Sequence, residues 1–220
     1  MNYLTHPLLN FEELEILRKN LGKELFWEDG KQTAGKYAAK VKNNLQLKRE
    51  SDLSKKFSEL IIKKILSNEL IKSFALPKKI HSTIFSKSTS GMKYGRHIDN
   101  SYMSSGRADL SFTIFLNCKD NYEGGDLLIE SFNSEKKFKL DAGEIIIYPS
   151  TYLHSVEEVI NGERLVFIGW IESYVKSIEE REYLFDLDAA AKSILAKYGR
   201  SEEVDLIFKS YSNLLRRLGS

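Results

Sequence analysis

The chain has 220 residues, of which 42% are hydrophobic and 29% are charged, with a formal net charge of +2. This balance is typical of one globular domain with a small appendage, and the small net charge argues against nucleic acid or an anionic membrane as the main partner. Lysines cluster between Lys31 and Lys56, but acidic residues lie among them. A solvated face is therefore favoured there over a phosphate-binding patch.

The compartment can also be predicted from composition. The first residues lack a basic region followed by an apolar core, so a secretory signal is not expected. No apolar stretch approaches the ~20 residues that a bilayer requires. The single cysteine, Cys118, excludes an internal disulfide and favours a reducing compartment. We therefore expect a cytoplasmic protein with no membrane partner.

The first part of the chain, about residues 1–75, is predicted to be helical. Asn10 and Glu13 have the spacing of a capping box, and leucines then recur at helical intervals at positions 14, 17 and 21. A second helix is expected to begin near Asp52. Its apolar face would comprise Leu53, Phe57, Leu60, Ile61 and Ile65.

From about residue 79 to 175 the pattern changes to short β-branched and aromatic runs separated by glycine-containing turns. The pair Asn161–Gly162, flanked by two such runs, predicts a hairpin turn. Glycines 124 and 125 are expected to serve another turn. Many short strands without intervening helices favour a β-sandwich or a jelly-roll barrel.

Helical character returns in residues 177–220, which we expect to form an extension after a domain spanning residues 1–176. Ser177 and Glu180 can cap a helix that ends at Gly199, and Ser201 can start the last one. These helices offer a surface for a homodimer. Their predicted inner residues are Leu184, Leu187, Ala191 and Ile194, then Val204, Phe208, Tyr211 and Leu215.

The four histidines differ in their surroundings. His6 and His81 have no carboxylate or second histidine at ligand spacing, so a structural or surface role is expected for each. His97 and Asp99 are two positions apart, which on a strand would place both side chains on one face. His154 follows a later apolar run. Two histidines and one carboxylate form the facial triad of non-haem Fe(II) oxygenases, which leaves coordination sites open for a 2-oxo acid and dioxygen.

Arg164 lies ten residues beyond His154, across the predicted hairpin. Its guanidinium could bind the distal carboxylate of the oxo acid through two hydrogen bonds. The alternative is a surface ion pair with Glu157 or Glu163, and the nearby metal triad favours the carboxylate site. A structural zinc site would instead be rich in sulfur.

Four further residues are candidates for the pocket. Lys42, Asn43 and Asn44 could reach a substrate from the N-terminal segment, although capping of a loop explains them equally well. Tyr94, beside the first ligand, is expected either to line the pocket or to pack against it.

The order His-x-Asp, distal His and then Arg resembles the iron(II)/2-oxoglutarate dioxygenases of the prolyl-4-hydroxylase-like class, and more narrowly the bacterial PKHD-type hydroxylases. The resemblance extends almost from end to end. It rests on segments 27–30, 41–44, 94–99, 107–111, 122–127, 140–144, 148–154, 184–188 and 213–216.

This resemblance implies an α+β protein with a double-stranded β-helix (jelly-roll) core. It also implies Fe(II), 2-oxoglutarate and dioxygen as reactants, with L-ascorbate (vitamin C) as a helper. The family pattern assigns iron to His97, Asp99 and His154, and oxoglutarate to Arg164. Relatives often have an aromatic residue in the predicted loop 86–91, and a tyrosine near Phe115; this chain has neither.

The implied reaction couples decarboxylation of 2-oxoglutarate to succinate and CO2 with hydroxylation of a small-molecule or protein substrate. Two other classes of protein are consistent with part of the pattern. A cupin-like metalloprotein would keep the barrel but would not need Arg164. A non-catalytic ligand-sensing module would have no reason to retain all four residues.

Overall fold

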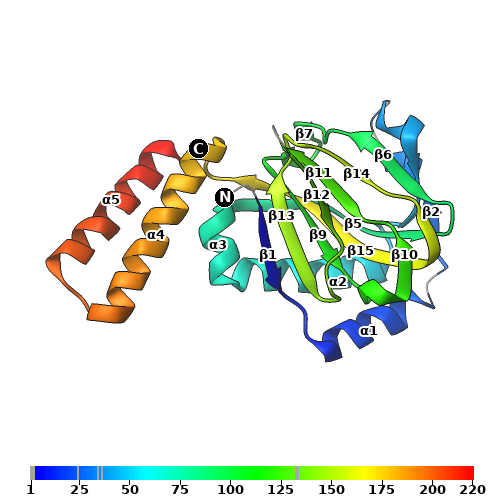
Figure 1. Cartoon of the computed structure of the whole chain (residues 1–220), viewed down its shortest axis with the longest axis horizontal. Coiled ribbons are helices and arrows are strands. Elements are labelled where there is room, and N and C mark those ends of the chain that lie inside the picture. Colours follow the sequence, from blue (N-terminus) through cyan, green and yellow to red (C-terminus); the bar gives the residue numbers. More distant parts are fainter. Residues whose placement is uncertain (1–2, 24, 34, 36, 132–133) are drawn as a thin grey trace.

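The computed structural model describes residues 3–23, 25–33, 35, 37–131 and 134–220. Within these residues, two antiparallel sheets face each other (Figure 1). The strands of the larger sheet are β1 (Leu4–Pro7), β2 (Trp27–Asp29), β4 (Leu45–Leu47), β5 (Pro77–Thr89), β9 (Leu110–Phe115), β10 (Tyr122–Gly124), β13 (Glu144–Pro149) and β15 (Val159–Ser173). Their order is β1-β13-β9-β15-β5-β4-β2, with β10 paired to β15.

The smaller sheet closes the other side of the barrel. Its strands are β3 (Lys42–Asn43), β6 (Lys93–His97), β11 (Leu127–Ser131), β12 (Ser134–Phe138) and β14 (Leu153–Val156), in the order β12-β11-β14-β6-β3. A separate pair joins β7 (Tyr102–Met103) to β8 (Gly106–Arg107). Three short 3₁₀ turns are η1 (Gly30–Thr33), η2 (Ala38–Val41) and η3 (Lys119–Asn121). The jelly-roll core is therefore confirmed.

Three helices cover the outer face of the larger sheet: α1 (Phe11–Leu21), α2 (Asp52–Ser67) and α3 (Glu69–Ala75). The predicted capping box of Asn10 and Glu13 is present. The helices and the outer face of the sheet share one buried apolar cluster, which makes the sheet a rigid platform. Leu60 was expected in this cluster but is 42% exposed, because α2 turns only Phe57, Ile61 and Ile65 fully inward.

The C-terminal helices α4 (Ile178–Tyr198) and α5 (Glu202–Leu218) form a hairpin that projects away from the barrel (Figure 1). Ser177 and Ser201 cap their N-termini as predicted, and Gly199 follows α4 with a positive φ. A small apolar cluster centred on Leu76, Val175 and Leu184 joins the hairpin to the barrel. Ile194, expected to face inward, is 37% exposed because it lies beyond this contact. The division of the chain at residues 176 and 177 stays a prediction.

The predicted hairpin turn at Asn161–Gly162 is wrong. Strand β15 continues through both residues, and Gly162 and Asn161 pair with β10. Strand β14, which carries His154, pairs with β6 and β11 and has no pairing with β15. Gly162 has a φ of +81°, so the glycine serves an irregularity inside a long strand.

The predicted loop 86–91 is also mostly strand, because β5 extends to Thr89 and leaves only a tight turn before β6.

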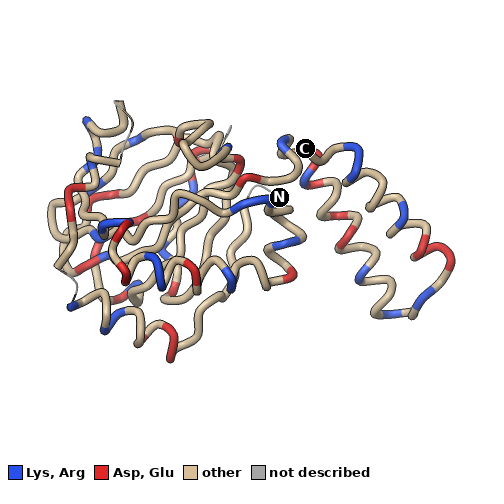
Figure 2. The backbone as a smooth tube through the Cα atoms, turned by 180° about the vertical axis from the view of Figure 1, so that it is seen from behind, with Lys and Arg blue, Asp and Glu red and all other residues tan. Residues whose placement is uncertain are grey.

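Acidic and basic residues are mixed along both the barrel and the helices (Figure 2). In the part of the chain that the structure describes, no helix is long and apolar enough to cross a membrane.

Candidate metal centre and adjoining pocket

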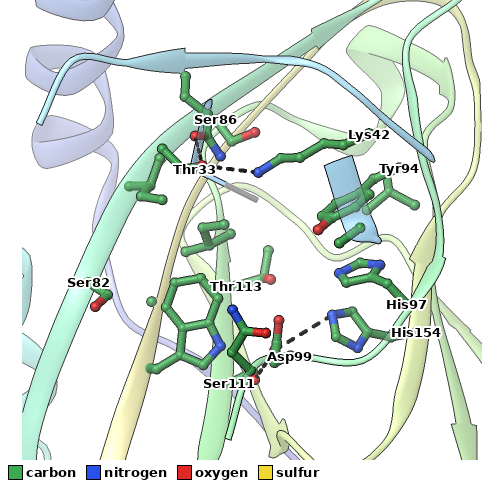
Figure 3. A pocket seen from close by; sticks show the side chains of 18 of the residues that line it. Thr33, Lys42, Ser82, Ser86, Tyr94, His97, Asp99, Ser111, Thr113 and His154 are labelled. Carbon is green, nitrogen blue, oxygen red and sulfur yellow. Dashed lines mark hydrogen bonds and ion pairs between the residues drawn. The ribbon is translucent and has the colours of Figure 1, made fainter. Parts of the chain in front are cut away.

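A cavity of about 400 Å³ lies between the two sheets. Alternate residues of the larger sheet line it, because side chains on a strand alternate between its two faces. These are Ser82, Ile84, Ser86 and Ser88 of β5, Ser111 and Thr113 of β9, and Arg164, Val166, Ile168 and Trp170 of β15. The smaller sheet contributes residues of β6, β11 and β14. Figure 3 shows the polar groups that point into this space.

His97, Asp99 and His154 meet at one end of the cavity (Figure 3). His97 and His154 are direct partners in the antiparallel register of β6 and β14. One ligand atom from each of the three residues lies within 4.8 Å of the others, and His154 Nε2 is 3.7 Å from Asp99 Oδ2. The expectation that His97 and Asp99 share a strand is only half right, since β6 ends at His97 and Asp99 follows in the next segment.

Backbone carbonyls orient both imidazoles. His97 Nδ1 donates to Gly95 O at 2.8 Å, and His154 Nδ1 donates to Tyr152 O at 3.0 Å. These hydrogen bonds leave the two Nε2 atoms as the free ligand positions. Burial and the neighbouring His154 lower the pKa of His97 to about 4, so the ring is neutral at physiological pH. A donor set of two neutral imidazoles and one carboxylate fits Fe(II).

Asp99 is held by a short chain of buried serines. Ser111 Oγ donates to Asp99 Oδ2 at 2.6 Å, and Ser111 Oγ lies 2.7 Å from Ser150 Oγ. Both serines are buried. Sequence reasoning did not assign Ser111 a role; its only signal was its place in segment 107–111.

Arg164 reaches the same cavity from β15, where it is paired with Ser88 of β5. Its side chain is 4% exposed, and its guanidinium carbon lies 5.5 Å from the centre of the Phe115 ring. Burial lowers the pKa of Arg164, and its Nε has no hydrogen-bond partner in the described structure. The alternative ion pairs do not form: Glu157 binds Lys137 at 2.6 Å and Glu163 approaches Lys87 at 3.9 Å.

Two tyrosines flank this guanidinium where Phe115 offers no hydroxyl. Tyr148 and Tyr122 are buried, and both act electrostatically on Arg164. Tyr148 lines the cavity together with Arg164, and burial raises its pKa. Gly125 approaches Arg164 closely: a Cβ at this position would lie 3.1 Å from Arg164 Cδ, and the residue has a φ of +68°. The sequence missed Tyr148 because its segment was identified only through His154.

Only two of the three pocket candidates in the N-terminal segment reach the cavity. Lys42 and Asn44 line the cavity and are buried, whereas Asn43 is exposed and points its amide toward Gly91 O. Tyr94 both lines the cavity and packs, since its ring stacks on His97 with centroids 3.6 Å apart.

The two other histidines lie away from the metal triad. His81 is buried and donates from Nε2 to Arg107 O at 2.9 Å, which is the structural role expected of it. His6 lies half-buried on the edge strand β1.

Comparison with known proteins defines the class first. Residues 83–172 match the model of the 2OG-Fe(II) oxygenase superfamily, and residues 179–219 match the PKHD-type hydroxylase C-terminal domain. Solved structures share the fold. A prolyl-4-hydroxylase from Pseudomonas putida has a TM-score of 0.55 at 16% identity, covering 78% of this chain and 92% of that one. A prolyl hydroxylase from Trichoplax adhaerens has a TM-score of 0.57 at 15% identity, covering 83% and 86%.

Whole-length relatives then define the family. A PKHD-type hydroxylase of Prochlorococcus marinus strain MIT 9215 is 74% identical over 220 residues, and one from strain NATL1A is 57% identical over 220 residues. Each alignment covers 100% of both chains. The chain therefore belongs to the PKHD-type hydroxylases. It is an enzyme of the iron(II)- and 2-oxoglutarate-dependent oxygenases, which sets aside the cupin-like and the non-catalytic alternatives.

Proposed function

We propose that His97, Asp99 and His154 hold Fe(II) and that Arg164 binds the C-5 carboxylate of 2-oxoglutarate. The observation that carries this proposal is the buried guanidinium of Arg164, in the same cavity as the triad and without a carboxylate partner among the described residues. A buried cation is costly unless it is paired, and a dicarboxylate bound to the metal would pair it. Tyr148, which lines the same cavity as Arg164, offers a hydroxyl that Phe115 lacks.

Bound iron and 2-oxoglutarate supply dioxygen activation, coupling decarboxylation to succinate and CO2 with substrate hydroxylation. The protein residues position these reactants. The backbone carbonyls of Gly95 and Tyr152 fix the two imidazoles, and Ser111 fixes Asp99. Apolar side chains of the cavity, including Leu127, Val166 and Ile168, keep water away from the reacting centre.

Anaerobic titration tests the assignment without a known substrate. The full-length protein should bind Fe(II), and adding 2-oxoglutarate should produce a weak visible charge-transfer band. His97→Ala should lose iron binding, whereas His6→Ala should not. Arg164→Lys should bind iron normally but weaken oxoglutarate binding, since an ammonium cannot make the two-pronged contact.

The exposed ion pair of Arg96 with Glu130 offers a matched arginine control. Arg96→Lys should leave oxoglutarate affinity unchanged. Absence of the band in the wild-type protein, together with absence of succinate under aerobic conditions, would contradict the proposed site.

Further expectations rest on the family resemblance and on composition. We propose that L-ascorbate sustains turnover by keeping the iron reduced and that the protein acts in the cytoplasm. We also propose that the substrate is a small molecule or protein and that neither nucleic acid nor membrane is a partner. Apolar side chains exposed on α4 and α5 support the proposal that these helices form a homodimer.

A further inference from the structure

One wall of the cavity is polar and is built from a part of the chain other than β15, which carries Arg164. Lys42 of β3, Asn44 between the two strands and Gln46 of β4 stand at alternate positions, and all three residues line the cavity. They are 5%, 8% and 1% exposed. Gln46 Nε2 is buried without a hydrogen-bond partner among the described residues. Asn44 Oδ1 is also unpaired there, but it packs against Gly30, which does not line the cavity. Such a wall is suited to a polar ligand group, because unpaired buried polar atoms are destabilising.

Lys42 carries the charge of this wall. Its Nζ donates to Thr33 Oγ1 at 3.2 Å and lies 5.0 Å from the centre of the Tyr94 ring (Figure 3). Within the described residues, no carboxylate lies at ion-pair distance from this ammonium. Burial lowers the pKa of Lys42 to about 8, with a further lowering by Arg49 that the more distant Asp99 and Asp29 oppose. A buried ammonium held by one neutral hydroxyl and one ring lacks the counter-charge that such groups normally have.

Arg49, an exposed residue, adds a second cation to the cavity lining. It lines the pocket, and its Nη2 donates to Ser82 O at 3.1 Å. Ser82 has a φ of +56°, a backbone conformation that a serine rarely adopts, at an irregularity between β5 and β15. Asp99 is the one carboxylate among the described residues that line the cavity, and the metal triad uses it. The lining is therefore cationic even after Arg164 is matched with oxoglutarate.

We propose that Lys42, supported by Arg49, binds an anionic group of the substrate, so that the molecule hydroxylated is a small carboxylate or phosphate compound. The inference rests on the proposed function, since Arg164 and the metal must account for oxoglutarate before Lys42 is left for the substrate. The cavity size favours a small compound. Small-molecule pockets span about 300–1,000 Å³, and this one, at about 400 Å³, must hold oxoglutarate as well.

Anion binding to the full-length protein tests the proposal. The protein is loaded with Zn(II), which has no redox chemistry, and with 2-oxoglutarate. It is then titrated with inorganic phosphate or with acetate at constant ionic strength, followed by backbone amide chemical shifts. We expect saturable shifts around Lys42 with one or both anions. The anion with the higher affinity identifies the substrate group as phosphate or carboxylate.

Variants separate charge from packing. Lys42→Gln should weaken anion affinity by about tenfold or more, equivalent to ~1.4 kcal/mol, whereas Lys42→Arg should retain most of it. Lys40→Gln removes the same charge from an exposed position on η2 and should have no effect. Equal affinity in wild type and Lys42→Gln, or an equal loss in Lys40→Gln, would overturn the proposal.

The two proposals fail in different ways. If the wild-type protein binds neither Zn(II) nor oxoglutarate, the proposed function fails, and the phosphate titration of the metal-free protein still tests Lys42. If oxoglutarate binds equally to the wild type and Lys42→Gln but no anion shifts depend on Lys42, only the substrate inference fails. Unchanged thermal unfolding of Lys42→Gln excludes misfolding as the cause of a lost affinity in that variant.

Discussion

At the scale of single residues, Ser111 is the contact that holds Asp99 in place. Its hydroxyl lies 2.6 Å from Asp99 Oδ2 and both groups are shielded from water. We predict that Ser111→Ala lowers the affinity for Fe(II) by about tenfold or more, because partners that orient metal ligands typically contribute ~10–100-fold. Anaerobic titration of the variant with Fe(II) measures this change.

A second buried serine provides the control for this substitution. Ser54 of α2 is 2% exposed but lies in the helical layer, far from the cavity lining. Ser54→Ala should leave metal affinity unchanged. An Fe(II) affinity of Ser111→Ala equal to that of the wild type would show that Asp99 keeps its position without the serine.

The lowered pKa of Lys42 predicts how the free energy of unfolding depends on pH. Its pKa is about 8 in the folded chain against an ordinary value of 10.5. Between these values the unfolded chain keeps a proton that the folded chain has released, so the free energy of unfolding rises with pH. The contribution is at most ~1.4 kcal/mol per pH unit.

Comparison with Lys42→Met isolates this contribution. Urea unfolding of the metal-free wild type and the variant, from pH 7 to 11, measures the difference between their free energies of unfolding. We expect this difference to shift in favour of the wild type between pH 8 and 10.5 and to be flat below pH 8. A flat difference throughout would show that the folded Lys42 has an ordinary pKa.

That His97, Asp99, His154 and Arg164 would share one site was predictable from the sequence, whereas their supporting contacts were not. Histidine is rare in this chain, and His97, Asp99, His154 and Arg164 stand at a characteristic spacing. The structure brings all four to one cavity. Ser111 and Tyr148 are ordinary types in β strands. Their roles depend on which strands face each other, and no local pattern encodes that arrangement.

At the scale of elements, the junction between barrel and C-terminal helices depends on Asp109. One oxygen accepts from Arg107 Nε at 2.7 Å, and the other accepts from the backbone N–H of Ser173 at 2.8 Å. We predict that Asp109→Ala lowers the free energy of unfolding by about 3 kcal/mol. The Arg107 guanidinium would lose its closest carboxylate and keep only Glu172 at 3.8 Å, and the buried N–H of Ser173 would lose its acceptor. Urea unfolding measures this loss.

An exposed ion pair serves as the comparison. Arg200 and Asp205 are bound at 3.0 Å between α4 and α5, with much of both side chains in water. Asp205→Ala should change stability little. Equal effects of the two aspartate substitutions would mean that the junction does not depend on Asp109.

Element boundaries show where local sequence signals fail. The capping signals at Asn10, Ser177 and Ser201 were correct because a helix cap involves only residues within one turn. The hairpin at Asn161–Gly162 was wrong because a glycine with positive φ serves a bulge as readily as a turn. Which of the two forms depends on distant strands: β15 takes its partners from β5, β9 and β10.

At the scale of the whole molecule, the C-terminal hairpin projects away from the barrel (Figure 1), and several of its apolar side chains are exposed. The residues on its inner side, including Tyr211, Leu214 and Leu218, pack toward Leu76 and Val175 at the junction. Near the turn between α4 and α5, Tyr198 is 82% exposed and Leu206 is 58% exposed. Large apolar side chains gathered at an exposed end are typical of a contact surface.

We predict that this end of the hairpin forms the proposed homodimer. Sedimentation velocity of the wild type at micromolar concentrations should give the mass of two chains. The double variant Tyr198→Glu/Leu206→Glu should give the mass of one chain, because charges at an apolar interface destabilise it. Phe11→Glu on α1, where the side chain is 73% exposed, should leave the dimer intact.

A monomeric wild type would contradict the prediction. A dimer that persists in the double variant would place the interface elsewhere. Since the proposed metal ligands, Arg164 and Lys42 all line one cavity of a single chain, we expect the monomeric variant to bind Fe(II) and oxoglutarate as the wild type does.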